Sequence, residues 1–419
     1  MKKITTLLSI LITTYSFAQD CSQGRYKDEI FSSVSTDSNI QYGANTDKNG
    51  SNVNLTLDVY TPVGDISISR ALIIMAHGGS FIGGDKAGAD VLSLCQDLAK
   101  KGYVVGSINY RVGMNGIPFP GPDSADATES VFRAVQDGRA AVRYFRKDFT
   151  ENGNVHGIDT SQIYFAGVSA GGFIALHLAY LDDMAEFPSY VDTINEPGLT
   201  GGLEGNSGNP GYSSKVKAIV NICGALGNKS WLTAGGIPVL SVHGDQDETV
   251  PYNTDILYMS GIFEIMEVDG SAAVAAQADA VGVDNCYKQF NGADHIPHIS
   301  SSAYYDTTLT YMTAFLAQFT CGDAFTCSDA ALFVSVSELN KRNASFEVYP
   351  NPAVNFITIN SNLENEYTVE IFDLLGKKVY NHKFSSDNKT IDVNAFKSGQ
   401  YLINLSDKTG TVSRKIVIE

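Results

Sequence analysis

Short apolar runs alternate with longer segments of helical periodicity from about residue 53 to about residue 320, and this alternation restricts the folds open to the chain. The middle runs are continuous stretches of β-branched and aliphatic residues, as expected for strands buried on both faces. The alternation predicts strands over residues 54–60, 71–76, 103–109, 163–166, 218–222, 238–242 and 287–290. It predicts helices over residues 90–101, 126–149, 170–182 and 302–319. The expected fold class is therefore α/β, with a mostly parallel sheet flanked by helices.

The pattern changes near residue 345 to short strand-like runs that turn residues separate. We predict strands over residues 346–349, 356–359, 367–372, 378–384, 390–393, 401–405 and 412–418. Strands this short and this closely spaced are typical of a small antiparallel β-sandwich. The expected organisation is an α/β domain over residues 19–322, a linker over 323–343 and an all-β sandwich over 344–419.

The first residues carry the pattern of a secretory signal peptide. Lys2 and Lys3 form a charged start, an apolar or small-polar run covers residues 4–15, and Ser16 and Ala18 occupy the −3 and −1 positions of a cleavage site. We therefore expect residues 1–18 to be removed as the protein leaves the cytoplasm. No other stretch approaches the ~20 apolar residues that a membrane-spanning helix needs, so no transmembrane segment is expected.

The charge balance argues against nucleic acid as a partner. The chain has 46 acidic and 29 basic residues, which gives a formal net charge of −17. Such an excess repels polyanions, and its ordinary consequence is a surface whose like charges keep molecules apart. A hydrophobic content of 43% is enough for a buried core.

Six cysteines follow the signal peptide, at positions 21, 95, 223, 286, 321 and 327. An even number in an exported protein permits disulfides, although six cysteines allow 15 pairings. Cys321 and Cys327 are near enough in sequence to close a small loop, so we expect this pair first. Cys95 and Cys223 fall in a predicted helix and a predicted strand, where a buried thiol and a disulfide are equally expected. No cysteine or histidine spacing suggests zinc, and no metal is expected.

Residues 167–171 match the pattern G-x-S-x-G, and Gly172 follows. The motif lies directly between the predicted strand 163–166 and the helical run 173–181. A serine on a sharp strand-to-helix turn presents its Oγ above the edge of the sheet, and glycines are favoured beside it because side chains there would collide with the turn. This context makes Ser169 the candidate nucleophile.

The predicted strand 71–76 is followed by the sequence H-G-G-S-F over residues 77–81. Cleavage of an ester passes through an oxyanion, which requires backbone N–H donors that no side chain obstructs. A loop of this type is the usual partner of the serine turn, together with the N–H of the residue after the nucleophile. We expect the amides of Gly79, Ser80 and Ala170 to form the oxyanion hole, with Gly78 making the turn possible.

An acid should follow the nucleophile and precede the histidine base. The candidates on or just after the loop beyond the predicted strand 238–242 are Asp245, Asp247, Glu248 and Asp255. Asp247 is favoured because it lies beyond the strand end with residues 250 and 251 packing behind it. Asp245 also fits the role of a turn-capping residue.

His295 and His298 are the two histidines that follow these acids and precede the C-terminal sandwich. His295 is favoured as the general base because it lies on the loop that leaves the last predicted strand, and His298 would then lie near the mouth of the pocket. The remaining histidines of the α/β domain precede the acid and are interpreted as supporting, surface or core residues: His77, His156, His177 and His243.

Residues 53–320 resemble the carboxylesterase and acetyl-esterase branch of the α/β-hydrolases, which is related to hormone-sensitive lipase. The resemblance rests on Leu57-Asp58-Val59-Tyr60-Thr61-Pro62, Asn109-Tyr110-Arg111, Gly157-Ile158-Asp159 and the G-x-S-A-G-G turn. It implies a triad of Ser169, Asp247 and His295, an acyl-enzyme intermediate and no cofactor. The implied substrate is a carboxylic ester, either a small molecule or one attached to a polysaccharide or another polymer.

Residues 344–419 resemble the type A sorting domain of proteins exported by the type IX secretion system. The matching segments are Tyr349-Pro350-Asn351-Pro352, Phe372-Asp373-Leu374-Leu375-Gly376-Lys377, Ser398-Gly399-Gln400-Tyr401 and Lys415-Ile416-Val417-Ile418-Glu419. The resemblance implies passage through the periplasm, recognition of the tail by the type IX machinery, and secretion to the cell surface or the medium. It also implies loss of the tail on the way.

A secreted serine esterase is the expected function, and two alternatives remain. A serine peptidase of the prolyl-oligopeptidase type shares the serine turn, but the short stretch before the first predicted strand cannot build the propeller that such enzymes usually carry. A catalytically silent surface protein would bind a ligand without needing a complete triad. The segments 113–125 and 183–214, both rich in glycine and proline, are candidate lids, binding loops or solvated insertions.

Overall fold

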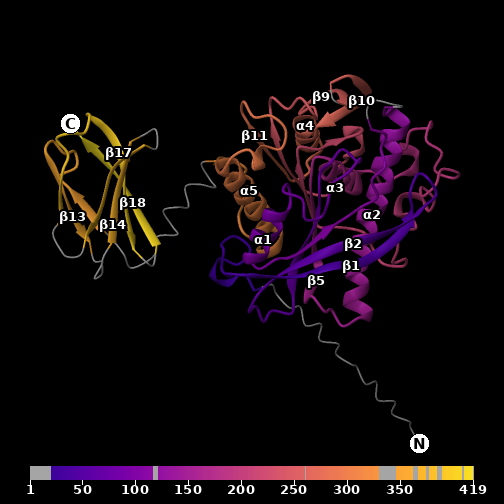
Figure 1. Cartoon of the computed structure of the whole chain (residues 1–419), viewed down its shortest axis with the longest axis horizontal. Coiled ribbons are helices and arrows are strands. Elements are labelled where there is room, and N and C mark those ends of the chain that lie inside the picture. The colour runs from indigo at the N-terminus through magenta and orange to yellow at the C-terminus, as the bar shows by residue number, and fades with distance from the viewer. Residues whose placement is uncertain are drawn as a thin grey trace, which may run out of the picture. The chain divides into compact units, whose positions relative to one another are not determined.

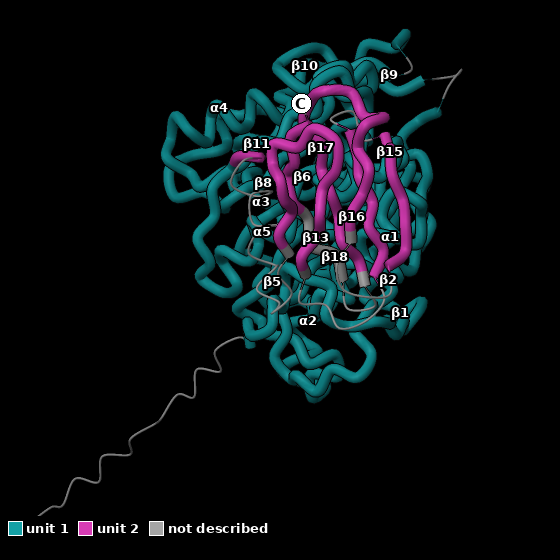
Figure 2. Tube along the Cα trace, turned by 90° about the vertical axis from the view of Figure 1, so that its left-hand side faces the viewer, with its two compact units in different colours: residues 1–327 teal, residues 328–419 magenta. Residues whose placement is uncertain are grey.

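The computed structural model describes residues 20–116, 121–259, 261–329, 346–361, 367–373, 377–384, 389–407 and 410–418. The predicted signal peptide lies outside the described residues, as do most of the predicted linker and residues 117–120 of the segment 113–125. The chain divides into two compact units, Met1–Cys327 and Ser328–Glu419 (Figure 2). Each unit has its own hydrophobic core.

An eight-stranded sheet forms the centre of the first unit (Figure 1). In spatial order its strands are β1 (Val34–Thr46), β2 (Asn52–Pro62), β4 (Val104–Ile108), β3 (Arg70–Ala76), β5 (Ile158–Val168), β6 (Ala218–Ile222), β8 (Val239–Gly244) and β11 (Asn285–Phe290). The pairs β1–β2 and β2–β4 are antiparallel, and every pair from β4 to β11 is parallel. The predicted α/β class with a mostly parallel sheet is confirmed.

The register of this sheet brings the ends of several strands together. Every residue of β3, β4, β6 and β8 is buried, and most of these residues are apolar, as expected for strands covered on both faces. Val168 pairs with Ile222, Ile222 with Val242, and Gly244 with Phe290. The loops that leave β5, β6, β8 and β11 therefore begin at one edge of the sheet.

Helices cover both faces of the sheet. They are α1 (Leu92–Lys100), α2 (Ser124–Glu151), α3 (Ala170–Tyr180), α4 (Ser271–Val281) and α5 (Ser302–Cys321). α1 packs against α5 and α2 packs against α3, and these two pairs lie on opposite faces (Figure 1). Side chains cap the helix starts: Asp123 accepts from the N–H of Asp126 in α2, and Ser301 accepts from that of Tyr304 in α5.

A second sheet of the first unit has the strand order β7 (Ala225–Leu226), β10 (Phe263–Gly270) and β9 (Thr254–Met259). β9 and β10 form an antiparallel hairpin between β8 and α4 in the chain. Figure 1 shows the hairpin beside α4. The sequence pattern predicts neither this hairpin nor α4, and it does not predict β1.

The second unit contains two antiparallel sheets, as the sequence predicts. One has the order β12 (Phe346–Tyr349), β13 (Phe356–Ser361) and β16 (Lys389–Asp392). The other has the order β15 (Lys378–Phe384), β14 (Tyr367–Asp373), β17 (Gly399–Asp407) and β18 (Gly410–Ile418). Alternate residues point inward, such as Val369 and Ile371 in β14 and Ile403 and Leu405 in β17, and they share one core.

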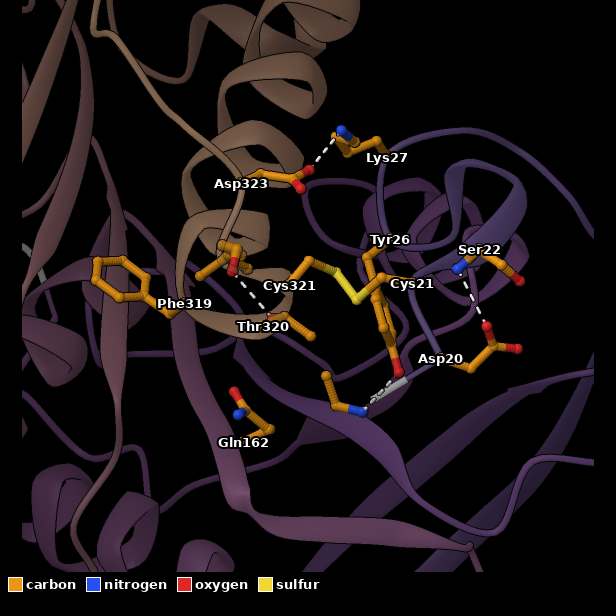
Figure 3. Close-up of a disulfide and its surroundings, with 12 residues drawn as sticks. Asp20, Cys21, Ser22, Tyr26, Lys27, Gln162, Phe319, Thr320, Cys321 and Asp323 are labelled. Atoms are coloured by element: carbon orange, nitrogen blue, oxygen red, sulfur yellow. Dashed lines mark hydrogen bonds and ion pairs between the residues drawn. A yellow bond between two sulfur atoms is a disulfide. The ribbon is translucent and has the colours of Figure 1, made fainter. Parts of the chain in front are cut away.

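Two disulfides are present, and neither is the pair expected first. Cys21 is bonded to Cys321, and Cys286 is bonded to Cys327. Cys321 is the last residue of α5, and its sulfur faces the N-terminal segment (Figure 3). The prediction of a disulfide between Cys321 and Cys327 is therefore wrong. Cys321 at the end of α5 faces the N-terminal segment, whereas Cys327 reaches Cys286 in β11.

Besides the disulfide, the N-terminal segment contacts the ends of both α5 and α1. Lys27 forms an ion pair with Asp323 close to the two sulfur atoms (Figure 3). The N–H of Tyr26 donates to the carbonyl of Lys101 at 2.7 Å.

The two cysteines outside the disulfides, Cys95 and Cys223, are buried free thiols, and burial raises the pKa of Cys95 to about 12.

Candidate active site

Ser169 occupies a sharp turn between β5 and α3. Its φ of +53° is in the left-handed region, and its N–H donates to the carbonyl of Ile222 at 2.7 Å. A Cβ on Gly167 would lie 2.0 Å from the carbonyl oxygen of Gly171, and a Cβ on Gly171 would lie 2.1 Å from that of Ala76. Only glycines fit this turn, and the strained backbone holds the serine side chain out from the sheet edge.

Two hydrogen bonds join Ser169 to the loops that follow β11 and β8. His295 Nε2 lies 2.9 Å from Ser169 Oγ, and His295 Nδ1 lies 2.6 Å from Asp247 Oδ2. A carboxylate only accepts, so Nδ1 carries the proton and Nε2 accepts from the serine hydroxyl. The serine, the histidine and the acid thus form one directed chain of hydrogen bonds.

Asp247 is held by four donors. Its Oδ1 accepts from the N–H groups of Thr249 and Val250, both at 2.8 Å, and its Oδ2 accepts from His295 and from His243 Nε2 at 3.0 Å. Burial raises the pKa of this carboxyl, but the hydrogen bonds from His243 and His295 outweigh burial and hold the pKa well below its ordinary value. Asp247 is therefore ionised at neutral pH.

The alternative acid and the alternative base have other surroundings. Asp245 accepts from the N–H of Gly292 at 2.6 Å, so it braces the turn before the histidine loop. His298 is buried, its Nε2 lies 2.9 Å from the carbonyl oxygen of Asp90, and burial lowers its pKa. Among the described contacts, neither Asp245 nor His298 reaches Ser169.

His243 contacts the acid directly, although the sequence places it only among supporting, surface or core residues. It lies in β8 and is fully buried. Its Nε2 faces Asp247 and the carbonyl of Val250 at 3.1 Å, and its Nδ1 lies 2.7 Å from Ser271 Oγ. A signal was present in the sequence, because a histidine in a buried strand four residues before an acid needs polar partners.

The loop after β3 has an unusual backbone. Gly79, Ser80 and Phe81 have φ values of +117°, +53° and +56°. The N–H of Gly78 donates to Asp90 Oδ2 at 2.7 Å and fixes the base of the loop. Two successive side-chain residues in the left-handed region are costly, and such strain is typical of functional loops.

Two of the three expected oxyanion donors lie at the pocket. Ser80 and Ala170 line it beside Ser169. Within the described part of the chain, no protein group accepts a hydrogen bond from the N–H of either residue. Gly79 is exposed and is not among the residues that line the pocket. Free N–H groups beside a nucleophile can bind an oxyanion.

A pocket of about 440 Å³ opens over Ser169. Apolar side chains form much of its wall: Phe81, Met114, Val131, Phe173, Leu257 and Ile265. The exposed carboxylates of Glu248 and Asp294 also line it. A second cavity of about 60 Å³ is almost entirely apolar and shares Val131, Phe173 and Ile265 with the first. The hairpin β9–β10 supplies Leu257 and Ile265 to both cavities.

Three potential metal ligands lie together in the described part of the chain. The ligand atoms of Cys223, His243 and Asp247 are within 4.8 Å of one another. Each is hydrogen-bonded, since Cys223 Sγ lies 3.6 Å from the carbonyl oxygen of Val242 and the other two bind each other. Hydrogen bonding accounts for this arrangement without an ion.

Two protein families match the chain. Residues 57–234 match the family described as BD-FAE, and residues 347–419 match the secretion system C-terminal sorting domain. The chain joins a BD-FAE esterase domain of the α/β-hydrolase fold to a secretion sorting domain. Both resemblances drawn from the sequence are confirmed, and the sorting domain indicates secretion to the cell surface or the medium. Within the described residues, no helix combines the length and apolar composition needed to cross a membrane.

Single proteins are similar to parts of the chain. An endo-acting ulvan lyase of Formosa agariphila is 36% identical over 86 residues, and the match covers 20% of this chain and 17% of the lyase. The chain thus spans about a sixth of the length of this curated relative. Thermogutta terrifontis esterase 2, both phosphorylated by paraoxon and with propionate bound, is 22% identical with a TM-score of 0.48. Each of these matches covers 68% of this chain and 94% of the esterase.

Proposed function

We propose that this protein is a secreted serine esterase that hydrolyses carboxylic esters through an acyl-enzyme on Ser169. The observation that carries the proposal is the chain of hydrogen bonds from Ser169 through His295 to Asp247, at 2.9 and 2.6 Å. Acyl transfer requires a nucleophile in contact with a base that an acid orients. The esterase family match supports the same reaction class.

In the first half-reaction, His295 Nε2 takes the proton of Ser169 while Oγ attacks the carbonyl carbon of the ester. Asp247 holds Nδ1–H and stabilises the imidazolium that forms. As the tetrahedral intermediate collapses, the bond to the alcohol oxygen breaks and His295 returns the proton to that oxygen. The alcohol leaves, and the acyl group remains on Ser169 as an ester.

In the second half-reaction, a water molecule takes the place of the alcohol. His295 accepts a proton from the water as its oxygen attacks the acyl carbon, and it then returns the proton to Ser169 Oγ. The acid is released and the starting state is restored. In both halves the carbonyl oxygen carries negative charge, and we propose that the amides of Ser80 and Ala170 bind it, with Gly79 shaping the loop or adding a third donor.

The pocket favours uncharged esters with a largely apolar acid part. Its wall is mainly apolar, and apolar walls with a few polar groups are typical of small-molecule sites. The carboxylates of Glu248 and Asp294 repel anionic substrates from the same pocket. Both a free ester and an ester attached to a neutral polymer meet these conditions. A series of p-nitrophenyl esters of increasing acid length would define the preferred acid part.

We also propose the organisation of the mature protein. Residues 1–18 act as the signal peptide, and residues 344–419 direct export and are then removed. The catalytic domain extends to Cys327 instead of ending at residue 322, because the disulfide to Cys286 ties that segment to β11. The linker is then shorter than the predicted segment 323–343.

Labelling with a fluorophosphonate probe tests the catalytic proposal. We expect one label per chain, located on Ser169 by peptide mass spectrometry, and loss of ester hydrolysis in proportion to labelling. A silent binding protein would not react. A peptidase would also react, but it would cleave a peptide p-nitroanilide, which we expect this protein to leave intact while it hydrolyses an ester with the same acyl group. Hydrolysis that survives complete labelling would refute the proposal.

A further inference from the structure

A buried chain of polar groups continues from Asp247 on the side away from Ser169. His243 Nδ1 lies 2.7 Å from Ser271 Oγ, and Ser271 Oγ lies 3.0 Å from Asn221 Nδ2. His243, Ser271 and Asn221 are fully buried. They belong to β8, to the first turn of α4 and to β6, so three elements of the scaffold meet behind the acid.

The hydrogen-bond partners at the two ends indicate how this chain is directed. Asn221 Oδ1 accepts from the N–H of Gly224 at 2.9 Å, so its amide nitrogen faces Ser271 and donates to Oγ. The hydroxyl of Ser271 is then free to donate to His243 Nδ1. At the other end, His243 Nε2 faces the carboxylate of Asp247 and a backbone carbonyl, which only accept. The acceptors that Nε2 faces place a proton on Nε2, and Nδ1 is positioned to accept from the hydroxyl of Ser271.

We propose that His243 is a positioning residue for the esterase reaction, which donates from Nε2 to Asp247 and fixes the oxygen that holds His295. The proposal rests on the proposed function, because it concerns the acid of the same triad. Asp247 Oδ2 accepts from both histidines, so His243 limits rotation of the carboxylate and takes up part of its negative charge. Ser271 keeps His243 in the tautomer that can donate.

The position of His243 in the sheet makes it a rigid anchor. β8 is paired on both sides, with β6 and with β11, whereas Asp247 lies on the loop beyond the strand. The hydrogen bond therefore couples a loop residue to a strand that is paired on both sides. Among the described residues, other titratable groups near the two histidines include Cys223, Asp294 and His298. Burial raises the pKa of Cys223 and lowers that of His298, so both are neutral near pH 7.

The test compares three variants of the full chain on a soluble p-nitrophenyl ester. We expect His243→Leu to lower kcat by about 10–100-fold with KM changed less than about threefold, because the acid is no longer held in place. The pH below which the rate falls should also rise. Without the hydrogen bond from His243, the negative charge of Asp247 stabilises the protonated, inactive form of His295 more strongly. His243→Gln retains an acceptor and a donor and should recover most of kcat. Ser271→Ala should give an intermediate loss.

His156→Leu is the matched control. His156 is also buried, but it precedes β5 at the strand end opposite Ser169, so its loss should leave kcat and the pH profile unchanged. Thermal unfolding is measured for every variant.

The proposal is overturned if His243→Leu keeps the kcat and pH profile of the parent. It is also overturned if His156→Leu lowers kcat by as much as His243→Leu does and His243→Gln does not restore kcat. If His243→Leu does not fold, a Ser271→Ala variant with parental kcat and pH profile overturns it. Activity that persists in Ser169→Ala would instead refute the proposed function.

Discussion

At the scale of single residues, the hydroxyl of Ser169 is the group that the proposed reaction consumes and restores. Ser169→Ala removes that hydroxyl and leaves the bond between His295 and Asp247 in place. We expect kcat to fall by about 10³–10⁶-fold, because the base has no nucleophile to activate. Steady-state kinetics on a p-nitrophenyl ester measures the loss, and an unchanged circular dichroism spectrum confirms the fold. A fall of less than about tenfold would rule out Ser169 as the nucleophile.

The two neighbouring acids should behave differently. Asp247 accepts from His295, whereas Asp245 braces the turn at Gly292. We expect Asp247→Asn to lower kcat by about 10²–10⁴-fold, because an amide no longer holds the proton on Nδ1 or stabilises the imidazolium. Asp245→Asn should lower kcat by less than about tenfold, because Asp245 does not orient the imidazole of His295. The opposite ranking in kcat would make Asp245 the acid.

His177 should give stability a pH dependence that is independent of catalysis. It is buried in α3, and burial lowers its pKa to about 4 despite the hydrogen bond to the carbonyl of Phe173. An unfolded chain has an ordinary histidine with a pKa of about 6.5, so between about pH 6.5 and 4 only the unfolded state binds the proton. The free energy of unfolding should therefore decrease as the pH falls through this window. Urea unfolding of His177→Leu should show a shallower pH slope than the parent, and equal slopes would contradict the assignment.

At the scale of elements, strands that are buried on both faces could be predicted from the sequence. β6 is apolar apart from Asn221, and the predicted strand 218–222 coincides with it. The sequence does not predict β1, because it is an edge strand with one buried residue and two register shifts, and its sequence shows little alternation. α4 was missed because its alanine-rich sequence shows no apolar stripe. The sequence of an element shows no apolar periodicity when the element is held in place mainly by residues that are distant in the chain, and such an element cannot be predicted from its own residues.

The same distinction holds for the site. Ser169, Asp247 and His295 each follow a strand of the parallel sheet, so their loops could be predicted to begin at one edge. The sequence could not show that β5, β6, β8 and β11 are neighbours in that order, which is what brings the loops together. The contact between His243 and Asp247 needs a loop that folds back onto its own strand. The disulfide partners likewise depend on where α5 and β11 end.

The disulfide between Cys286 and Cys327 anchors the strand that precedes the His295 loop. β11 is paired on one side only, with β8, and the bond closes a separation of 41 residues. Replacing both cysteines by serine should lower the free energy of unfolding by about 2–4 kcal/mol, because the unfolded chain gains freedom. Activity at 25 °C should persist, since the hydrogen bonds of the proposed triad do not involve either cysteine. Thermal unfolding measures the effect, with Cys95→Ala as a control that breaks no disulfide.

At the scale of the whole molecule, the covalent links and the candidate chemistry are confined to the first unit. All six cysteines lie at or before residue 327, where the first unit ends. Ser169, Asp247 and His295 belong to that unit as well, as do the residues that line the pocket. The second unit has a core of its own built from alternating strand residues. Export and hydrolysis can therefore be carried by separate parts of one chain.

Removal of the tail should separate these two tasks. A protein of residues 19–342 keeps both disulfides, and a unit with its own core folds without its neighbour when few contacts cross the boundary. We expect it to hydrolyse a soluble ester with a kcat close to that of the full chain. In the native host, the same truncation should leave active enzyme in the periplasm, because the sorting domain is absent. If the tail instead binds an insoluble substrate, the truncated protein should lose activity on the polymer alone, and the secreted protein should keep its tail in the culture medium. Mass spectrometry of the secreted protein decides between these outcomes, since a mature chain that still ends at Glu419 would contradict removal of the tail.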